Sequence, residues 1–105
     1  MDAALKEAFV EAYERPEALK AGFDLYRCFP QDEKDNSSMK ERPVTVPVLY
    51  MRGQDDPCDL ERYIAGFKES GIQDLVAAVI PGCGHFMAEE QPERVAEALG
   101  RFIRP

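Results

Sequence analysis

The sequence lacks any apolar run that approaches the roughly 20 residues needed to span a bilayer. It also lacks the beginning of a secretory signal, because "MDAALKEAF" has acidic residues where a signal peptide has a basic region and an apolar core. From these two absences we expect a cytoplasmic protein with no membrane partner.

Basic residues and cysteines are both scarce. The 13 Lys and Arg residues are scattered among 20 Asp and Glu residues, and the resulting net charge of −7 argues against a phosphate-binding face. The three cysteines, Cys28, Cys58 and Cys83, match the spacing of neither a disulfide framework nor a zinc site. We therefore expect no nucleic-acid partner, no metal and no cofactor, and reduced cysteines that act as small apolar fillers.

The N-terminal part of the chain has helical periodicity. With 105 residues, 45% of them apolar, the chain suits one modest folded domain or part of a larger one. Within residues 1–30 the spacing predicts one helix over residues 2–13 and a second that opens at Pro16, whose apolar face is Leu19, Phe23, Tyr26 and Phe29. The polar stretch "PQDEKDNSSMKERP" has no periodicity, so residues 31–43 are predicted to form an exposed loop.

Residues 44–105 show an alternation of strands and helices. The apolar runs at 44–51 and 75–80 predict strands that are buried on both faces. Between them "CDLERYIAGFKESG" predicts a helix capped by Asp59 and ended by Gly71, and Pro92 opens a last helix. A strand, a helix and a second strand form a βαβ unit with parallel strands, so the fold class is α/β. Because two strands are too few for a stable sheet, we expect one end of a larger sheet.

The candidate site lies in the loops after the two predicted strands, because sites in parallel sheets form at the carboxyl ends of the strands. The first loop, "RGQDDPC", carries Asp55 and Asp56, and the second, "PGCGHF", carries His85, the single histidine of the chain. A carboxylate bound to one ring nitrogen fixes the tautomer of an imidazole that acts as a general base. The structural alternatives are a turn-forming role for Asp56 and a local hydrogen bond for His85.

A nucleophile is missing beside this pair. The sequence has no G-x-S-x-G elbow, nor the same turn centred on Asp or Cys, and its serines lie in the predicted loop and at a helix end. Cys83 shares a loop with His85, but it has no helix N-terminus of its own to favour the thiolate. A Cys83–His85 dyad is therefore the weaker hypothesis.

Two segments carry a family resemblance. "VPVLYMRGQDDP" and, after a helix and a strand, "IPGCGHFMAEEQPERVAEALGRFI" resemble the C-terminal third of α/β-hydrolase-fold enzymes, over residues 44–104. The family's G-x-x-D turn matches Gly53 to Asp56, and its G-H-F segment matches His85. The resemblance thus implies that Asp56, in place of Asp55, is the acid of a catalytic triad and that His85 is its base.

The upstream segment narrows the resemblance. "ERPEALKAGFDLYRCF" is similar to the segment that leaves the cap domain in the epoxide-hydrolase and haloalkane-dehalogenase branch. The Y-R step of that branch implies that Tyr26 donates a hydrogen bond to the epoxide oxygen of a substrate. The alternative for Tyr26 is packing, because it lies on the same apolar stripe as Leu19 and Phe23.

The resemblance implies a hydrolase most similar to epoxide hydrolases, acting on a small-molecule substrate when complete. The family's nucleophile elbow, oxyanion hole and most of the cap precede the matched segment, so we expect this chain alone to be inactive. Exposed strand edges predict a homo-oligomer, or pairing with a missing N-terminal portion. The competing class is a non-catalytic fragment or truncated paralogue that acts as an oligomerisation module.

Overall fold

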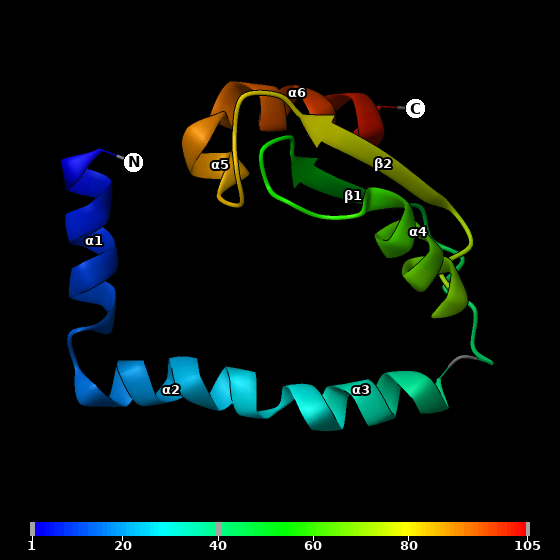
Figure 1. Ribbon diagram of the computed structural model, residues 1–105, viewed down its shortest axis with the longest axis horizontal. Helices are drawn as coiled ribbons and strands as arrows, with labels where there is room; N and C mark the ends of the chain where they lie inside the picture. The colour runs from blue at the N-terminus through cyan, green and yellow to red at the C-terminus, as the bar shows by residue number, and fades with distance from the viewer. Residues whose placement is uncertain (1, 40, 105) are drawn as a thin grey trace. The chain divides into compact units, whose positions relative to one another are not determined.

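The computed structural model describes residues 2–39 and 41–104 and divides the chain into two compact units, Met1–Ser38 and Met39–Pro105. The predicted segments 1–30, 31–43 and 44–105 include Met1, Lys40 and Pro105, which lie outside the described residues. The first unit is helical and the second combines helices with strands (Figure 1).

Three helices form the N-terminal unit: α1 (Ala3–Tyr13), α2 (Pro16–Arg27) and α3 (Phe29–Ser38). The side chain of Asp2 caps α1 by accepting a hydrogen bond of 2.8 Å from the amide of Leu5. Pro16 occupies the first turn of α2, where its fixed φ fits and its missing N–H costs nothing. The two helices predicted from periodicity are therefore confirmed.

Helix α3 corrects the predicted loop over residues 31–43. Most of that segment, up to Ser38, is helical, while Met39 and residues 41–43 are outside helices and strands. The helix has no apolar stripe that could have predicted it, and it is supported locally by a 2.9 Å hydrogen bond between Gln31 and Asp35, one turn apart. The exposure expected for the described residues of this segment is confirmed.

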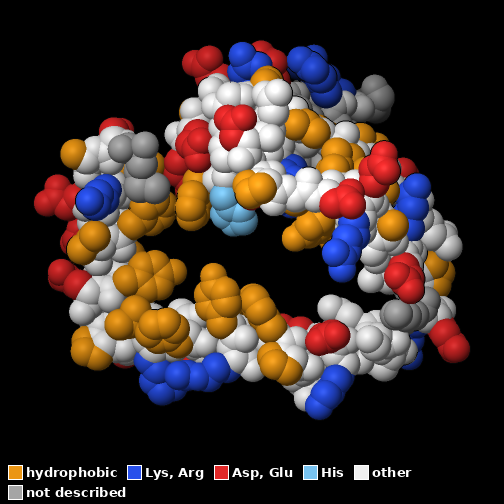
Figure 2. All heavy atoms as spheres, viewed as in Figure 1, with side chains coloured by type: hydrophobic (Ala, Val, Ile, Leu, Met, Phe, Trp, Pro, Cys, Tyr) orange, Lys and Arg blue, Asp and Glu red, His pale blue; other side chains and the backbone are white. Residues whose placement is uncertain are grey.

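No described residue of the N-terminal unit is buried. Leu19, Phe23 and Tyr26 of the predicted apolar face form a stripe on α2, whereas the fourth residue, Phe29, begins α3. The side chains of the stripe remain about half exposed or more, with Phe23 at 55% and Tyr26 at 67%. Figure 2 shows hydrophobic side chains, in orange, at the surface along α1 and α2. The stripe is therefore an uncovered surface of this unit.

The C-terminal unit is the predicted α/β element. Its order is β1 (Val48–Gly53), α4 (Leu60–Glu69), β2 (Leu75–Ile80), α5 (Met87–Glu90) and α6 (Pro92–Ile103). The strands pair in parallel with Val48 opposite Leu75 and Gly53 opposite Ile80. Figure 1 shows α4 and α6 on different sides of this two-stranded sheet. This combination of helices with a parallel two-stranded sheet is compatible with the predicted α/β class.

Local signals explain the crossover between the strands. Asp59 caps α4 as predicted, accepting a hydrogen bond of 3.1 Å from the amide of Arg62. Aromatic side chains of α4 then pack on the sheet: Tyr63 stacks on Tyr50 at 6.0 Å between centroids, and Phe67 meets the same ring at 4.9 Å. Gly71 follows the helix at φ 98°, a left-handed conformation suited to glycine.

The strands differ from prediction in extent and burial. β1 begins at Val48 and not at residue 44; only an isolated bridge joins Val44 to Ile72, and the intervening Pro47 has no N–H to donate. Burial on both faces was also predicted, but Val76 and Val79 of β2 are 48% and 49% exposed. Because the described residues form a sheet of only two strands, each strand keeps one unpaired edge.

None of the helices within residues 2–39 and 41–104 has the length and apolar character that crossing a membrane requires.

Candidate functional site

Parallel pairing brings the two loops that follow β1 and β2 together at the carboxyl ends of the strands. The last residues of β1 and β2, Gly53 and Ile80, are register partners, so the chain leaves both strands side by side. The amide of Gln54 donates to the carbonyl of Ile80 at 2.9 Å, and the amide of Asp55 donates to the carbonyl of Cys83 at 2.9 Å. These bonds continue the ladder into the loops that carry the candidate residues.

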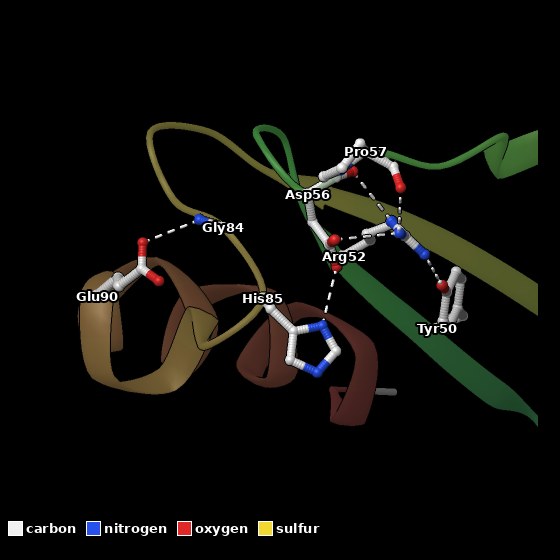
Figure 3. Close-up of polar contacts among 7 residues, drawn as sticks. All are labelled: Tyr50, Arg52, Asp56, Pro57, Gly84, His85 and Glu90. Carbon is white, nitrogen blue, oxygen red and sulfur yellow. Dashed lines mark hydrogen bonds and ion pairs between the residues drawn. The ribbon is translucent and has the colours of Figure 1, made fainter.

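Asp56 and His85 meet in these loops. Nδ1 of His85 lies 3.0 Å from Oδ2 of Asp56, within the 2.6–3.2 Å expected for an acid that orients a base (Figure 3). The carboxylate is only 18% exposed, whereas the imidazole is 77% exposed. One edge of the ring is therefore tied to a sheltered anion while the opposite edge, with Nε2, is accessible.

Arg52 lies behind the carboxylate and was not among the predicted site residues. Its Nη2 lies 3.3 Å from Oδ1 of Asp56, the oxygen that His85 does not use, and the side chain is 12% exposed. Its Nε donates to the carbonyl of Asp56 at 3.4 Å, and Nη2 donates to the carbonyl of Pro57 at 3.3 Å. The remaining nitrogen, Nη1, donates to the hydroxyl of Tyr50 at 3.1 Å. The guanidinium thus contacts four oxygens, three of them on Asp56 and Pro57 of the turn and one on Tyr50 of β1.

The surroundings of Arg52 favour the charged form of its guanidinium. Desolvation acts to lower the pKa of its guanidinium, but contacts with Tyr50 and Tyr63 and the negative charge of Asp56 outweigh it and raise the pKa. The guanidinium carbon lies 4.9 Å from the centre of the Tyr63 ring, which adds a cation–π contact. The one signal for this role in the sequence is a lone arginine in an otherwise apolar strand.

Gly53 permits the two loops to approach. A Cβ atom at this position would lie 1.9 Å from the carbonyl oxygen of Gly84 and 2.6 Å from that of Cys83, closer than any side chain tolerates. Its absence of a side chain therefore allows the loop with His85 to lie against the end of β1.

The side chains of three polar residues, Gln54, Glu90 and Gln91, bind the backbone of the loop that carries His85. The amide of Gly82, at φ 69°, donates to Oε1 of Gln54 at 3.3 Å, while its carbonyl accepts from Gln91 at 3.1 Å. The amide of Gly84 donates to Oε2 of Glu90 at 2.9 Å (Figure 3). Glu90 belongs to α5, a single turn that the sequence did not predict.

Cys83 is a core residue in this loop. It is 1% exposed, and its thiol donates to the carbonyl of Ile80 at 3.3 Å. Burial, followed by the nearby charges of Glu90 and Asp55, raises the pKa of the thiol and so disfavours the nucleophilic thiolate. Burial and the raised pKa therefore argue against a Cys83–His85 dyad. The predicted role of small apolar filler is confirmed for Cys83 but is wrong for Cys28, which is exposed.

The side chains of the other two candidates, Asp55 and Tyr26, make no described contact with His85. Asp55 is exposed, and its side chain makes no hydrogen bond or ion pair with the described residues. Tyr26 belongs to the N-terminal unit, where its ring packs on Phe29 with 5.1 Å between centroids. The contact of Tyr26 with a substrate stays a prediction.

A pocket of about 440 Å³ opens beside His85. Tyr50, Tyr63 and Met87 contribute to its wall together with Arg52 and Asp56. Its lining among the described residues includes no serine, no cysteine and no carboxylate other than that of Asp56. Within the same residues no cluster of three or more His, Cys, Asp or Glu side chains is arranged to hold a metal ion.

Comparison of the sequence with known protein families and with curated proteins finds no match.

Proposed function

We propose that the C-terminal unit carries the acid and the base of a hydrolase triad, with His85 as general base and Asp56 as the acid that orients it. The observation that supports this proposal most strongly is the 3.0 Å contact between Nδ1 of His85 and a sheltered carboxylate at the carboxyl ends of two parallel strands. The accessible edge of the His85 ring, which lies beside a pocket, would allow Nε2 to exchange a proton with a bound group.

The chemistry follows from the two ring nitrogens. Nδ1–H donates to Asp56, which leaves the lone pair on Nε2 to take a proton from a hydroxyl group or a water molecule. The imidazolium that forms carries its charge next to the Asp56 carboxylate, which stabilises it until the proton is passed on. This half of the reaction needs no residue of the pocket other than the pair.

The reaction class is proposed from the motifs that surround the pair. The G-x-x-D turn of Gly53 to Asp56 and the G-H-F segment of His85, in that order, resemble the end of an α/β-hydrolase sheet, and the segment before them is similar to epoxide hydrolases. The proposed substrate is a small molecule with an epoxide or ester group, and Tyr26 is the proposed donor to its oxygen. The nucleophile is proposed to come from outside the described residues.

The decisive experiment is turnover by the native protein isolated from its source, assayed on a panel of epoxides and activated esters. His85→Ala and Asp56→Asn should each lower kcat by about a thousandfold or more, as loss of a triad member does in comparable hydrolases. Asp55→Asn is the matched control, since it removes the adjacent exposed carboxylate and should leave turnover unchanged. Turnover that persists in His85→Ala would reject the proposal, and the intact mass of the native protein shows which chain was assayed.

The 105-residue chain expressed alone is proposed to give no turnover on the same panel, because an acid and a base do not replace a covalent centre. Turnover by this chain that disappears in His85→Ala would reveal a nucleophile among its own residues.

The second candidate function is an oligomerisation module. It is favoured by the half-exposed Val76 and Val79 of β2 and by the unpaired strand edges of the described sheet, since proteins usually cover such surfaces by association. Light scattering at low micromolar concentration should then give a dimer or a larger homo-oligomer. Association that His85→Ala leaves intact, without turnover in any native form, would favour this candidate over the hydrolase.

A further inference from the structure

We propose that Arg52 is a positioning residue, which fixes the Asp56 carboxylate so that one oxygen faces Nδ1 of His85; this inference rests on the proposed function of the pair. The two carboxylate oxygens are divided between two partners. Oδ1 lies 3.3 Å from Nη2 of Arg52, and Oδ2 lies 3.0 Å from Nδ1 of His85. A carboxylate held from one side in this way keeps its other oxygen directed at the ring (Figure 3).

The guanidinium is itself fixed, which a positioning role requires. Two of its nitrogens bind the carbonyls of Asp56 and Pro57, the third binds the hydroxyl of Tyr50, and its plane lies near the ring of Tyr63. All of these partners are on β1, the loop that follows it, or α4. The planar fork of an arginine matches this arrangement of oxygens, whereas a lysine offers one point charge on a flexible stem.

Geometry and charge make separable contributions. Arg52→Lys keeps the positive charge near Asp56 and removes the fork, whereas Arg52→Met removes both. If the fork positions the carboxylate, both variants should free it to rotate away from the ring. If Arg52 only stabilises the turn through the backbone carbonyls, its variants should unfold more easily without changing the imidazole of the molecules that stay folded.

The tautomer of His85 distinguishes these roles. Because the chain has a single histidine, ring-¹⁵N NMR of the uniformly labelled chain gives one set of imidazole signals. A carboxylate that accepts from Nδ1–H selects that tautomer in the neutral ring, whereas an unconstrained imidazole favours the proton on Nε2. We expect Arg52→Lys and Arg52→Met to lose the Nδ1–H signal in favour of the Nε2–H form.

Arg62→Lys is the matched control, because Arg62 lies on α4 of the same unit and its side chain makes no hydrogen bond or ion pair with the described residues. It should keep the wild-type tautomer. An Nδ1–H signal retained in folded Arg52→Lys would overturn the proposal. If the Arg52 variants do not fold, NMR of the Arg52 guanidinium in the wild-type chain tests the proposal instead. Separate, slowly exchanging guanidinium signals support the positioning role, and free rotation of the group contradicts it.

The outcomes separate this inference from the proposed function. A tautomer that depends on Arg52, in a protein without His85-dependent turnover, keeps the positioning role and rejects the hydrolase. Turnover that requires His85, with a tautomer that ignores Arg52, keeps the hydrolase and rejects the positioning role.

Discussion

The two units of this chain differ in the range of the contacts that hold them. In the N-terminal unit the side-chain ion pairs join neighbours on the sequence, such as Lys20 and Arg27 with Asp24, and no described residue is buried. In the C-terminal unit Asp56 and His85 are 29 positions apart, and Ile80, at the end of β2, and Cys83, in the loop that follows, are buried. The second unit thus has a polar contact between residues far apart in the sequence, supported by paired strands, that holds two side chains at a defined distance.

This difference explains why the candidate site is in the C-terminal unit. Local hydrogen bonds and helix caps determine a helix but not what lies against it, because they constrain only neighbouring residues. Two side chains are held at a defined distance only by elements that are fixed to each other, and here two paired strands and a close glycine contact provide this. The following experiments test this contrast.

Amide hydrogen exchange should show the largest difference between the units. We expect the paired amides of β1 and β2 to exchange more than about a hundredfold more slowly than those of α1 to α3, because opening the strands breaks buried contacts. Mass spectrometry of peptides from each element measures this. Equal protection in the two units would contradict the contrast.

Glycine-to-alanine substitutions should give the second-largest difference in stability effect between the two units. Gly53→Ala should destabilise the C-terminal unit by about 2 kcal/mol or more, because its Cβ would overlap the backbone of Gly84 and force the loops apart. Gly22→Ala should change stability by less than about 1 kcal/mol, since the nearest atom, 3.2 Å away, belongs to the movable ring of Tyr13 and alanine favours the helix. Urea unfolding followed by circular dichroism compares the two.

Gly66→Ala is the control for a glycine of the C-terminal unit with nothing within 4 Å of the added Cβ. It should be neutral or slightly stabilising because it lies within α4. A Gly53→Ala variant as stable as this control would contradict the close approach of the loops.

Thiol reactivity offers a smaller contrast. Cys28 of the N-terminal unit is exposed, whereas Cys83 is buried and its pKa is raised by desolvation. Alkylation of Cys83 in the folded chain should be more than about tenfold slower than that of Cys28, and the two rates should converge in denaturant. Peptide mapping after timed labelling measures both rates, and rapid labelling of Cys83 in the folded chain would mean that the site loop is open.

The ion pairs of Asp24 should give the smallest effect. Hydrogen bonds from Lys20 and then Arg27 lower the pKa of this carboxyl below 3.8, so its contribution to stability is present above that pH. It is lost as the pH falls through the lowered value. Asp24→Asn should therefore reduce the thermal stability of α2 slightly at neutral pH and not at all in strong acid, as followed by circular dichroism. An equal effect at both pH values would mean that charge is not the cause.

Sequence patterns predicted the elements whose signals are local and redundant. β2 has the predicted bounds, and the N-cap of α4 at Asp59 and its termination by Gly71 were correct, because apolar runs and capping residues act over a few positions. α3 was missed because its polar surface has no stripe, and α5 because it is a single turn. The start of β1 was placed too early because pairing before Pro47 is limited to one bridge.

The site was predicted in outline from topology. Parallel strands bring their following loops together, which predicted an acid of the first loop, Asp55 or Asp56, beside His85. The choice of Asp56 came from the resemblance to the family's G-x-x-D turn. The role of Arg52 was not predictable in the same way, because an arginine on a strand can point to either face and its partners lie across a turn and on α4. The relation of Tyr26 to the pair depends on contacts beyond its own unit, so it stays a prediction.

The most direct test of the central claim, that Asp56 orients His85, is the ring-¹⁵N spectrum of the neutral imidazole in the wild-type chain and in Asp56→Asn. We predict the proton on Nδ1 in the wild type and in the control Asp55→Asn. In Asp56→Asn, Arg52 should hold the amide oxygen and leave the NH₂ group facing Nδ1, which moves the proton to Nε2. A wild-type spectrum with the proton already on Nε2 would contradict the claim.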